Sequence, residues 1–177
     1  MQYIVGLLHE LDIYSQVSHC LVNTAYSNSQ AQNRISQQKI NGIMVPTGVK
    51  NAHPVVQKYV IGANDEPNGH GTICVKWDDL KEALKGKEDQ MAARKLKALL
   101  RISNIYVGDA IANLLMIEAV LRDMNYSIQD FSKLYQEYPS KMFKAVVNDR
   151  TAFKTTWDET RLVSPASLQA FIDNAVS

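Results

Sequence analysis

The sequence predicts an α/β protein: a single α/β/α domain with a small mixed sheet between helices, followed by a C-terminal connector segment. Two observations lead to this prediction. Short apolar runs of strand length alternate along the chain with segments whose apolar residues recur at helical spacing. The 177 residues are 46% hydrophobic, which is enough for one buried core and fits one domain with an appendage.

The first part of the chain contains two predicted helices and two predicted strands. Apolar residues recur near helical spacing over residues 2–16, which predicts an amphipathic helix. Residues 17–25 contain an apolar run typical of a buried strand. Residues 30–41 are mostly polar with isolated isoleucines, which indicates a solvated helix with a thin apolar stripe. Residues 43–45 are expected to form a short strand.

The middle of the chain is expected to add two strands and a long helix. Residues 52–57 open a helix, residues 59–62 read as a strand, and residues 73–77 read as another. Asn64 and Asp65 are poor strand formers, so we expect the strand before them to be short. One long helix with a basic polar face is predicted over residues 79–101.

The last part of the chain mixes helices with a connector. Asp109 is expected to cap a helix whose apolar face belongs to the core. A capping-box-like start at Ser127 predicts another helix that ends before Pro139. We expect a strand at 142–147 and an irregular connector at 151–162. A last helix is predicted after Ser164-Pro165, with these apolar residues inward: Leu168, Phe171, Ile172 and Val176.

The stretch from Glu66 to Thr72 concentrates hydrogen-bonding side chains and glycines, and it has the composition of a ligand loop. Gly69 and Gly71 allow a positive φ or a close approach of the backbone to a bound molecule. Glu66, Asn68 and His70 offer donors and acceptors suited to hydroxyl groups. Clusters of Gly, Asn and Pro also mark plain turns, and the residues alone leave both interpretations open.

A second motif, Thr47-Gly48-Val49-Lys50, follows the strand predicted at 43–45. The ends of strands in open α/β sheets are where ligands usually bind. A simple turn and a solvated lysine would account for the same residues. Lysine supplies a compact positive charge, which suits a phosphate group.

With both motifs, the stretch from Val45 to Thr72 resembles the third domain of the phosphoacetylglucosamine mutase family, part of the α-D-phosphohexomutase superfamily. The family loop reads Glu-Ala-Asn-Gly-His-Gly-Thr, and Pro67 stands here in place of the Ala. The family's Thr-Gly-Val-Lys is unchanged. Three further segments are similar to the family: Tyr26-Ser27-Asn28-Ser29 (family Tyr-Ala-Asn-Gly), Gly108 to Ala112, and Lys144 to Arg150 after Pro139.

The resemblance implies an isomerase that interconverts N-acetylglucosamine 6-phosphate and 1-phosphate through a bisphosphorylated sugar, in UDP-N-acetylglucosamine biosynthesis. Residues 1–140 would be the sugar-binding third domain, with residues 1–16 the helix leading into it. Residues 141–177 would connect to a C-terminal phosphate-binding domain. The family's phosphoserine loop and its Asp-rich Mg²⁺ loop have no counterpart in residues 1–177. The chain is therefore expected to be an inactive fragment that packs against the missing domains, with Mg²⁺ bound only in the intact enzyme.

Within this chain the resemblance assigns a role to each residue of the two motifs. Glu66 would bind the sugar, supported by Asn68 and His70, while the backbone at Gly69 and Gly71 would approach it. The other motif would supply Thr47 and Gly48 for substrate binding and Lys50 for charge stabilisation. No metal ligand is expected in this chain.

Composition limits the other function classes. A formal net charge of +1 and the lack of aromatic residues on the basic helix face argue against nucleic acid. The absence of a long apolar run argues against a membrane span, and two cysteines provide no disulfide framework, so a cytoplasmic protein is expected. Two alternatives remain open: a non-catalytic module that binds sugar phosphates or another protein, and a metal enzyme that uses His53, Asp65, Glu66 and His70.

Overall fold

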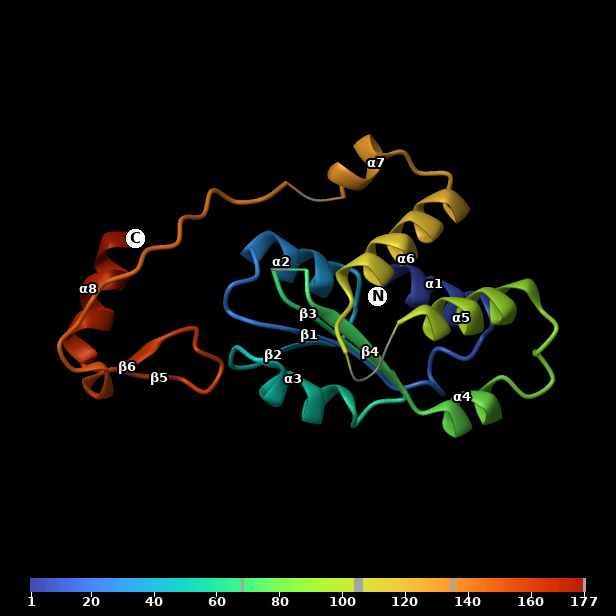
Figure 1. Cartoon of the computed structure of the whole chain (residues 1–177), viewed down its shortest axis with the longest axis horizontal. Helices are drawn as coiled ribbons and strands as arrows, with labels where there is room; N and C mark the ends of the chain where they lie inside the picture. Colours follow the sequence, from blue (N-terminus) through green and yellow to red (C-terminus); the bar gives the residue numbers. More distant parts are fainter. Residues whose placement is uncertain (68, 104–106, 135, 177) are drawn as a thin grey trace.

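The computed structural model describes residues 1–67, 69–103, 107–134 and 136–176 (Figure 1). Its main sheet has four strands, which are β1 (His19–Asn23), β2 (Gly42–Met44), β3 (Ile61–Asp65) and β4 (Gly71–Val75). Their order is β2-β1-β3-β4. Strand β1 runs parallel to both β2 and β3, while β3 and β4 form an antiparallel hairpin. The predicted mixed sheet is therefore confirmed.

Helices cover both faces of this sheet, as the α/β/α prediction requires. Those that precede residue 139 are α1 (Gln2–Glu10), α2 (Ser29–Gln37), α3 (Val49–Val56), α4 (Trp77–Ala83), α5 (Met91–Ile102), α6 (Ala110–Asp123) and α7 (Ile128–Ser132). Helix α3 lies on one face, while α1 and α5 lie on the other (Figure 1). Within the described ranges, no helix is both long and apolar enough to cross a membrane.

Successive side chains along each strand point to opposite faces of the sheet, so the core is divided between these two faces. Ile61 and Ala63 of β3 join the cluster formed with α1 and α5. Cys20 and Val22 of β1 point the other way and pack with Val56 of α3. Side chains on both faces of the sheet are therefore buried. Because both faces need apolar residues, the strands are continuous short apolar runs in the sequence.

Gly62 allows α3 to rest directly on the sheet. A Cβ built on Gly62 would lie 2.2 Å from the carbonyl oxygen of Val56, at the end of α3. No side chain fits into that gap, so the glycine determines how closely helix and sheet approach. The same helix begins just after Thr47 and Gly48, so this packing also places the Thr47 to Lys50 motif.

Several predicted element boundaries are wrong. The helix predicted over 2–16 ends at Glu10, where the chain turns with a positive φ at Asp12. The helix predicted over 79–101 is two helices, α4 and α5, because Gly86 turns the chain with φ 76° between them. Strand β3 continues through Asn64 and Asp65, since Thr72 Oγ1 donates a hydrogen bond to Asn64 Oδ1 across the hairpin and satisfies both buried side chains. Residues 142–147 form no strand; the segment is extended and has no strand beside it in the described part of the chain.

The caps of α6 and α7 are confirmed, but the predicted burial of α6 is not. Asp109 accepts hydrogen bonds from the amides of Ile111 and Ala112, and Ser127 forms a capping box with Asp130. None of the residues of α6 is buried, and Ile111 is 72% exposed. Met116 and Val120 pack against the core cluster, whereas Ile111, Leu114 and Leu115 on the predicted apolar face are 56–72% exposed.

The chain ends in a small separate unit. It contains the 3₁₀ turn η1 (Arg150–Ala152), the hairpin β5 (Lys154–Thr155) and β6 (Leu162–Ser164), and α8 (Ala166–Val176). The irregular connector predicted at 151–162 is therefore partly a hairpin. The residues of α8 predicted to point inward are 37–81% exposed, because so small a unit offers little core to cover them.

Candidate functional site

The parallel strands bring the predicted ligand loops to one edge of the sheet. Strands β1, β2 and β3 all end there, because β1 pairs in parallel with both of its neighbours. The chain leaves β2 into the Thr47 to Lys50 motif and leaves β3 into the hairpin at Glu66. Strand β1 separates the two loops, so two interstrand spacings, about 10 Å, lie between their origins.

A tight backbone turn forms the loop from Glu66 to His70. The amide of Glu66 donates to the carbonyl of His70 at 2.9 Å, and the amide of Gly69 donates to the carbonyl of Glu66 at 2.9 Å. Gly69 has φ 87°, which an L-residue rarely adopts. Pro67 occupies the second position of the turn, where its fixed φ is well tolerated. The substitution of Pro67 for the family's Ala is thus compatible with a closed hairpin.

The predicted ligand residues of this hairpin differ in accessibility. Glu66 is half-buried, whereas Gly69 and His70 are exposed at the tip. Asn68, which was assigned a supporting contact, lies outside the described residues. The hairpin therefore presents an acidic and an imidazole side chain, together with the backbone at Gly69, next to the sheet edge.

Contacts from the start of α6 support the base of the hairpin. The side-chain amide of Asn113 donates to the carbonyl of Gly71 at 3.1 Å. A Cβ on Gly108 would come within 3.3 Å of the ring of His70. A Cβ built on Gly71 would lie 2.9 Å from the carbonyl oxygen of Asn64 on β3, so the structure provides a packing reason for this glycine besides the predicted approach of a ligand. Sequence reasoning did not identify Asn113, whose polar side chain among the apolar residues of α6 was the available signal.

The Thr47 to Lys50 motif forms the N-terminus of α3. Gly48 is the N-cap residue with φ 114°, and Lys50 lies exposed in the first helical turn. Asn51 Nδ2 donates to the carbonyl of Thr47 at 3.0 Å. The amide and the hydroxyl of Thr47 both donate to the carboxylate of Glu159, each at 2.9 Å. In this structure a carboxylate of the C-terminal unit therefore occupies the donors of Thr47.

A polar cavity of about 590 Å³ lies at the same edge of the sheet. It is bounded by residues 25–29 after β1, by Asp65 and Pro67 of the hairpin, and by residues 137–142. Asn23 also contributes to its wall; this side chain is 5% exposed, and its Oδ1 has no hydrogen-bond partner among the described residues. The pKa of Asp65 is raised, because the surrounding chain removes part of the hydration of its carboxylate.

Asn28 has a structural role on the wall of this cavity. Its Oδ1 accepts from the amide of Gln30 and so caps α2. The same side chain donates from Nδ2 to the carbonyl of Tyr138 at 2.9 Å and accepts from the Tyr138 amide at 3.2 Å. The motif that includes Tyr26 and Asn28 therefore holds the start of the linker to the C-terminal unit.

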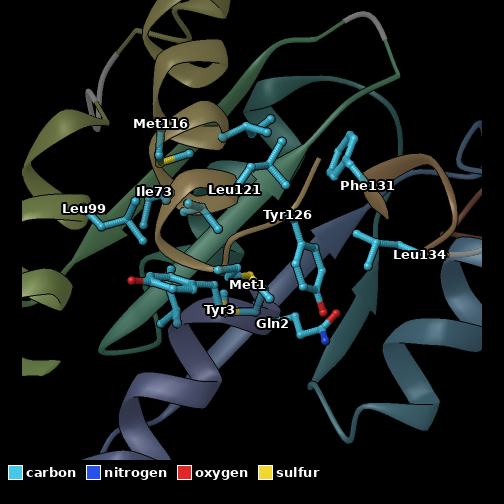
Figure 2. A pocket seen from close by; sticks show the side chains of 14 residues that line it. Met1, Gln2, Tyr3, Ile73, Leu99, Met116, Leu121, Tyr126, Phe131 and Leu134 are labelled. Atoms are coloured by element: carbon cyan, nitrogen blue, oxygen red, sulfur yellow. The ribbon is translucent and has the colours of Figure 1, made fainter. Parts of the chain in front are cut away.

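A second cavity, of about 200 Å³, is apolar and lies between α1 and α6 (Figure 2). Figure 2 shows Met1, Tyr3, Met116, Leu121 and Phe131 around it. Gln2, Tyr3 and Tyr126 add polar atoms to its lining, and the hydroxyl of Tyr3 donates to Asp123 at 2.7 Å. This lining suits apolar packing, and none of the predicted site residues contributes to it.

Across the residues that the structure describes, no group of three or more His, Cys, Asp or Glu side chains is arranged to hold a metal ion. His53, one member of the alternative metal site, instead hydrogen-bonds Gln57 at 2.9 Å and approaches Cys74 at 3.8 Å. The part of the chain that the structure describes thus does not fit a magnesium site.

The first part of the chain matches a known family model. Residues 1–126 match the family described as "Phosphoacetylglucosamine mutase AMG1, domain III". The phosphoacetylglucosamine mutase of Arabidopsis thaliana is 32% identical over 167 residues, with 88% of this chain and 30% of that protein covered. The human phosphoacetylglucosamine mutase is 33% identical over 163 residues, with 88% and 30% covered. The chain spans about 30% of the length of these curated relatives.

Solved structures show the same arrangement. An N-acetylphosphoglucosamine mutase from Aspergillus fumigatus, in complex with GlcNAc-6P and magnesium, superposes with a TM-score of 0.87 at 31% identity. That comparison covers 98% of this chain and 36% of the other. An N-acetylglucosamine-phosphate mutase of the α-D-phosphohexomutase superfamily, in its substrate complex, gives a TM-score of 0.82 at 32% identity over 99% of this chain and 35% of the other. The chain belongs to the phosphoacetylglucosamine mutase family, and its residues 1–126 correspond to domain III of that family.

Proposed function

We propose that this chain supplies the sugar-binding loop of a phosphoacetylglucosamine mutase, which interconverts N-acetylglucosamine 6-phosphate and N-acetylglucosamine 1-phosphate. The observation that carries the proposal is that the Thr47 to Lys50 and Glu66 to Thr72 motifs follow β2 and β3, two parallel strands on either side of β1, at one edge of the sheet. Ligands of open α/β sheets bind at this edge. The Aspergillus fumigatus relative was solved with GlcNAc-6P, a ligand of the proposed chemical class.

The two loops divide the recognition of a sugar phosphate between them. The carboxylate of Glu66 accepts hydrogen bonds from sugar hydroxyl groups, and His70, with Asn68, adds neighbouring contacts. The turn at Gly69 allows the ligand to approach the backbone, and the backbone at Gly71 is the second point of approach. The positive charge of Lys50, with Thr47 and Gly48 beside it, stabilises the phosphate group. Because phosphoryl transfer depends on positioning and electrostatics, these residues bind and orient the sugar.

The remaining chemistry belongs to other parts of the longer enzyme. The Aspergillus fumigatus relative was solved with magnesium, whereas the described residues of this chain do not fit a magnesium site. Magnesium would supply charge neutralisation at the transferring phosphate. Without it, and without a phosphoserine loop, the isolated chain binds sugar phosphate but does not transfer the phosphoryl group.

We further propose the division of the chain into residues 1–140, the sugar-binding domain, and residues 141–177, a connector toward a phosphate-binding domain. The extended, exposed course of residues 139–149 supports this boundary. The exposed apolar faces of α6 and α8 support packing against other domains of the enzyme, since a module that functions alone would be expected to bury them. A cytoplasmic location remains a prediction.

Titration of the ¹⁵N-labelled chain with N-acetylglucosamine 6-phosphate, followed by amide NMR, tests this function. We expect shifts at both 47–50 and 66–72, and a weaker response to glucose 6-phosphate. Glu66→Ala is expected to abolish the shifts at 66–72. Glu88→Ala, which removes another exposed carboxylate far along the chain, serves as the matched control and is expected to respond like the parent chain.

The phosphate contribution is tested separately with Lys50→Gln. This variant should lose affinity for N-acetylglucosamine 6-phosphate but respond to unphosphorylated N-acetylglucosamine like the parent chain. If a folded parent chain gave no shifts at either loop with any of these sugars, the proposed sugar-binding role would be refuted for the isolated domain.

A further inference from the structure

The C-terminal unit, residues 150–176, is held together by its own polar contacts and follows an exposed linker. Arg161 and Asp173 form an ion pair at 2.5 Å, and the side chain of Gln169 accepts from the amide of Leu162 at 2.6 Å. These bonds join the β5–β6 hairpin to α8. In contrast, the linker at 139–149 is exposed along its length, and Val146 is 92% exposed. The orientation of the unit must therefore be determined by contacts outside the linker.

The tip of the β5–β6 hairpin holds Glu159 in a strained conformation. Glu159 has φ 60°, which is disfavoured for a residue with a Cβ because the side chain approaches its own carbonyl group. Asp158 stabilises this turn by accepting hydrogen bonds from the hydroxyls of Thr156 and Thr160, at 2.6 and 2.9 Å. Glycine would relieve the strain, so the presence of glutamate at this position points to a requirement for its side chain.

The side chain of Glu159 reaches the loop that carries Lys50. One oxygen, Oε2, accepts from both the amide and the hydroxyl of Thr47, each at 2.9 Å. Figure 1 shows the β5–β6 hairpin reaching toward the loop between β2 and α3. Thr47 directly precedes the N-cap Gly48, so these two bonds constrain the backbone that leads into the first turn of α3, where Lys50 lies. Hydrogen bonds to a charged acceptor are stronger than neutral ones.

The other end of the linker is also attached to the same edge of the sheet. Asn28 pairs with the backbone of Tyr138 through both atoms of its side-chain amide. The linker thus leaves the domain at a fixed point. Because the linker starts from this fixed point, it keeps the C-terminal unit near Thr47, and the Glu159–Thr47 contact forms at a high effective concentration. If that contact is lost, the unit undocks but stays attached through the linker.

We propose that Glu159 is a positioning residue: its bonds to Thr47 dock the C-terminal unit and, through that docking, hold the loop that presents Lys50. The position of the proposed phosphate-binding lysine therefore depends on the segment that follows the sugar-binding domain. The assignment of phosphate to Lys50 rests on the proposed function, whereas the docking contact does not. The two bonds are expected to change the ratio of docked to undocked unit by about tenfold.

Three substitutions in the full chain test this role. Glu159→Ala removes the carboxylate and keeps a Cβ at the strained φ. Glu159→Gly removes the carboxylate and relieves the strain, so the hairpin cannot fail for that reason. Glu159→Gln keeps an oxygen that can accept both bonds, so it should restore docking. Glu88→Ala serves as the control for loss of an exposed carboxylate.

The measurement uses residual dipolar couplings and amide shifts, without any sugar. One alignment tensor should fit the couplings of residues 19–75 and 154–173 in the parent chain, in Glu159→Gln and in Glu88→Ala. Glu159→Ala and Glu159→Gly should require two tensors and shift the amides of 47–50. A parent chain that needs two tensors would overturn the proposal. It would also be overturned if both carboxylate-free variants kept one tensor, or if their amides at 47–50 did not shift.

A sugar titration separates this result from the proposed function. Loss of the response at 66–72 in the parent chain would refute sugar binding and leave the docking measurement intact. Conversely, a normal sugar response with unchanged docking in Glu159→Gly would refute the positioning role alone.

Discussion

Gly62→Ala should destabilise the protein substantially, because the packing of α3 on the sheet leaves no room for a side chain. The added Cβ would lie 2.2 Å from the carbonyl oxygen of Val56 and 2.7 Å from its Cα. Contacts below 3.0 Å essentially do not occur, and these atoms belong to the backbone, so helix or strand must move by nearly an ångström. Overpacking of this kind costs about 1–3 kcal/mol, and the clash with backbone favours the upper part of that range.

Reduced freedom of the unfolded chain offsets this cost only in part. Replacement of glycine by alanine gains about 0.4–1 kcal/mol from the unfolded state when the native conformation tolerates it. The expected net loss is therefore about 1–2 kcal/mol. For a chain of this size that corresponds to a decrease in Tm of roughly 2–8 °C.

Urea and thermal denaturation, followed by far-ultraviolet circular dichroism, would measure the effect. The matched control is Gly6→Ala on the exposed side of α1, where an added Cβ meets nothing within 4 Å. In that helix alanine should stabilise the protein by about 0.5–1 kcal/mol. If Gly62→Ala were as stable as the parent chain, the close approach of α3 to the sheet would not be a constraint, and this reasoning would be refuted.

Two further predictions concern buried groups. Thr72→Val removes the donor that satisfies Asn64 Oδ1 and should lower the free energy of unfolding, measured by urea denaturation, by about 1–3 kcal/mol. The double variant with Asn64→Ala should recover part of that loss. A Thr72→Val variant as stable as the parent chain would contradict this pairing. Burial raises the pKa of the Cys20 thiol to about 12 and also raises that of Cys74. Both thiols should therefore react with Ellman's reagent at about pH 8 more slowly in the folded chain than in urea. Rapid reaction of either in the folded chain would show that it is not buried.

Local signals in the sequence predicted the elements whose formation depends on near neighbours. The Asp109 cap and the Ser127 capping box are satisfied within a few residues, and both were predicted correctly. Predictions that depended on more distant contacts were less successful. Asn64 has low strand propensity, but its cross-strand bond to Thr72 keeps β3 in the sheet. Tertiary context commonly overrides propensity in this way.

In the candidate site, too, local features were predicted from the sequence and long-range ones were not. The motifs at Thr47 to Lys50 and Glu66 to Thr72 were sufficient to assign the family from their residues, whereas their role as ligand loops stays a prediction. Their placement at one sheet edge follows from the parallel pairing of β1 with β2 and β3, which the sequence did not specify. The Asn113 contact to Gly71 was also not predicted, because it depends on where α6 packs.

The sequence by itself determined the α/β/α class, most of the helices and strands, and the family, because spacing, caps and motifs are local properties of the chain. Only the tertiary structure showed that Ile111 and other apolar residues of α6 are exposed and that Glu159 bonds to Thr47. Those two residues are separated by 112 positions along the chain. A contact at that separation depends on the path of the whole chain between them, and no local pattern encodes it.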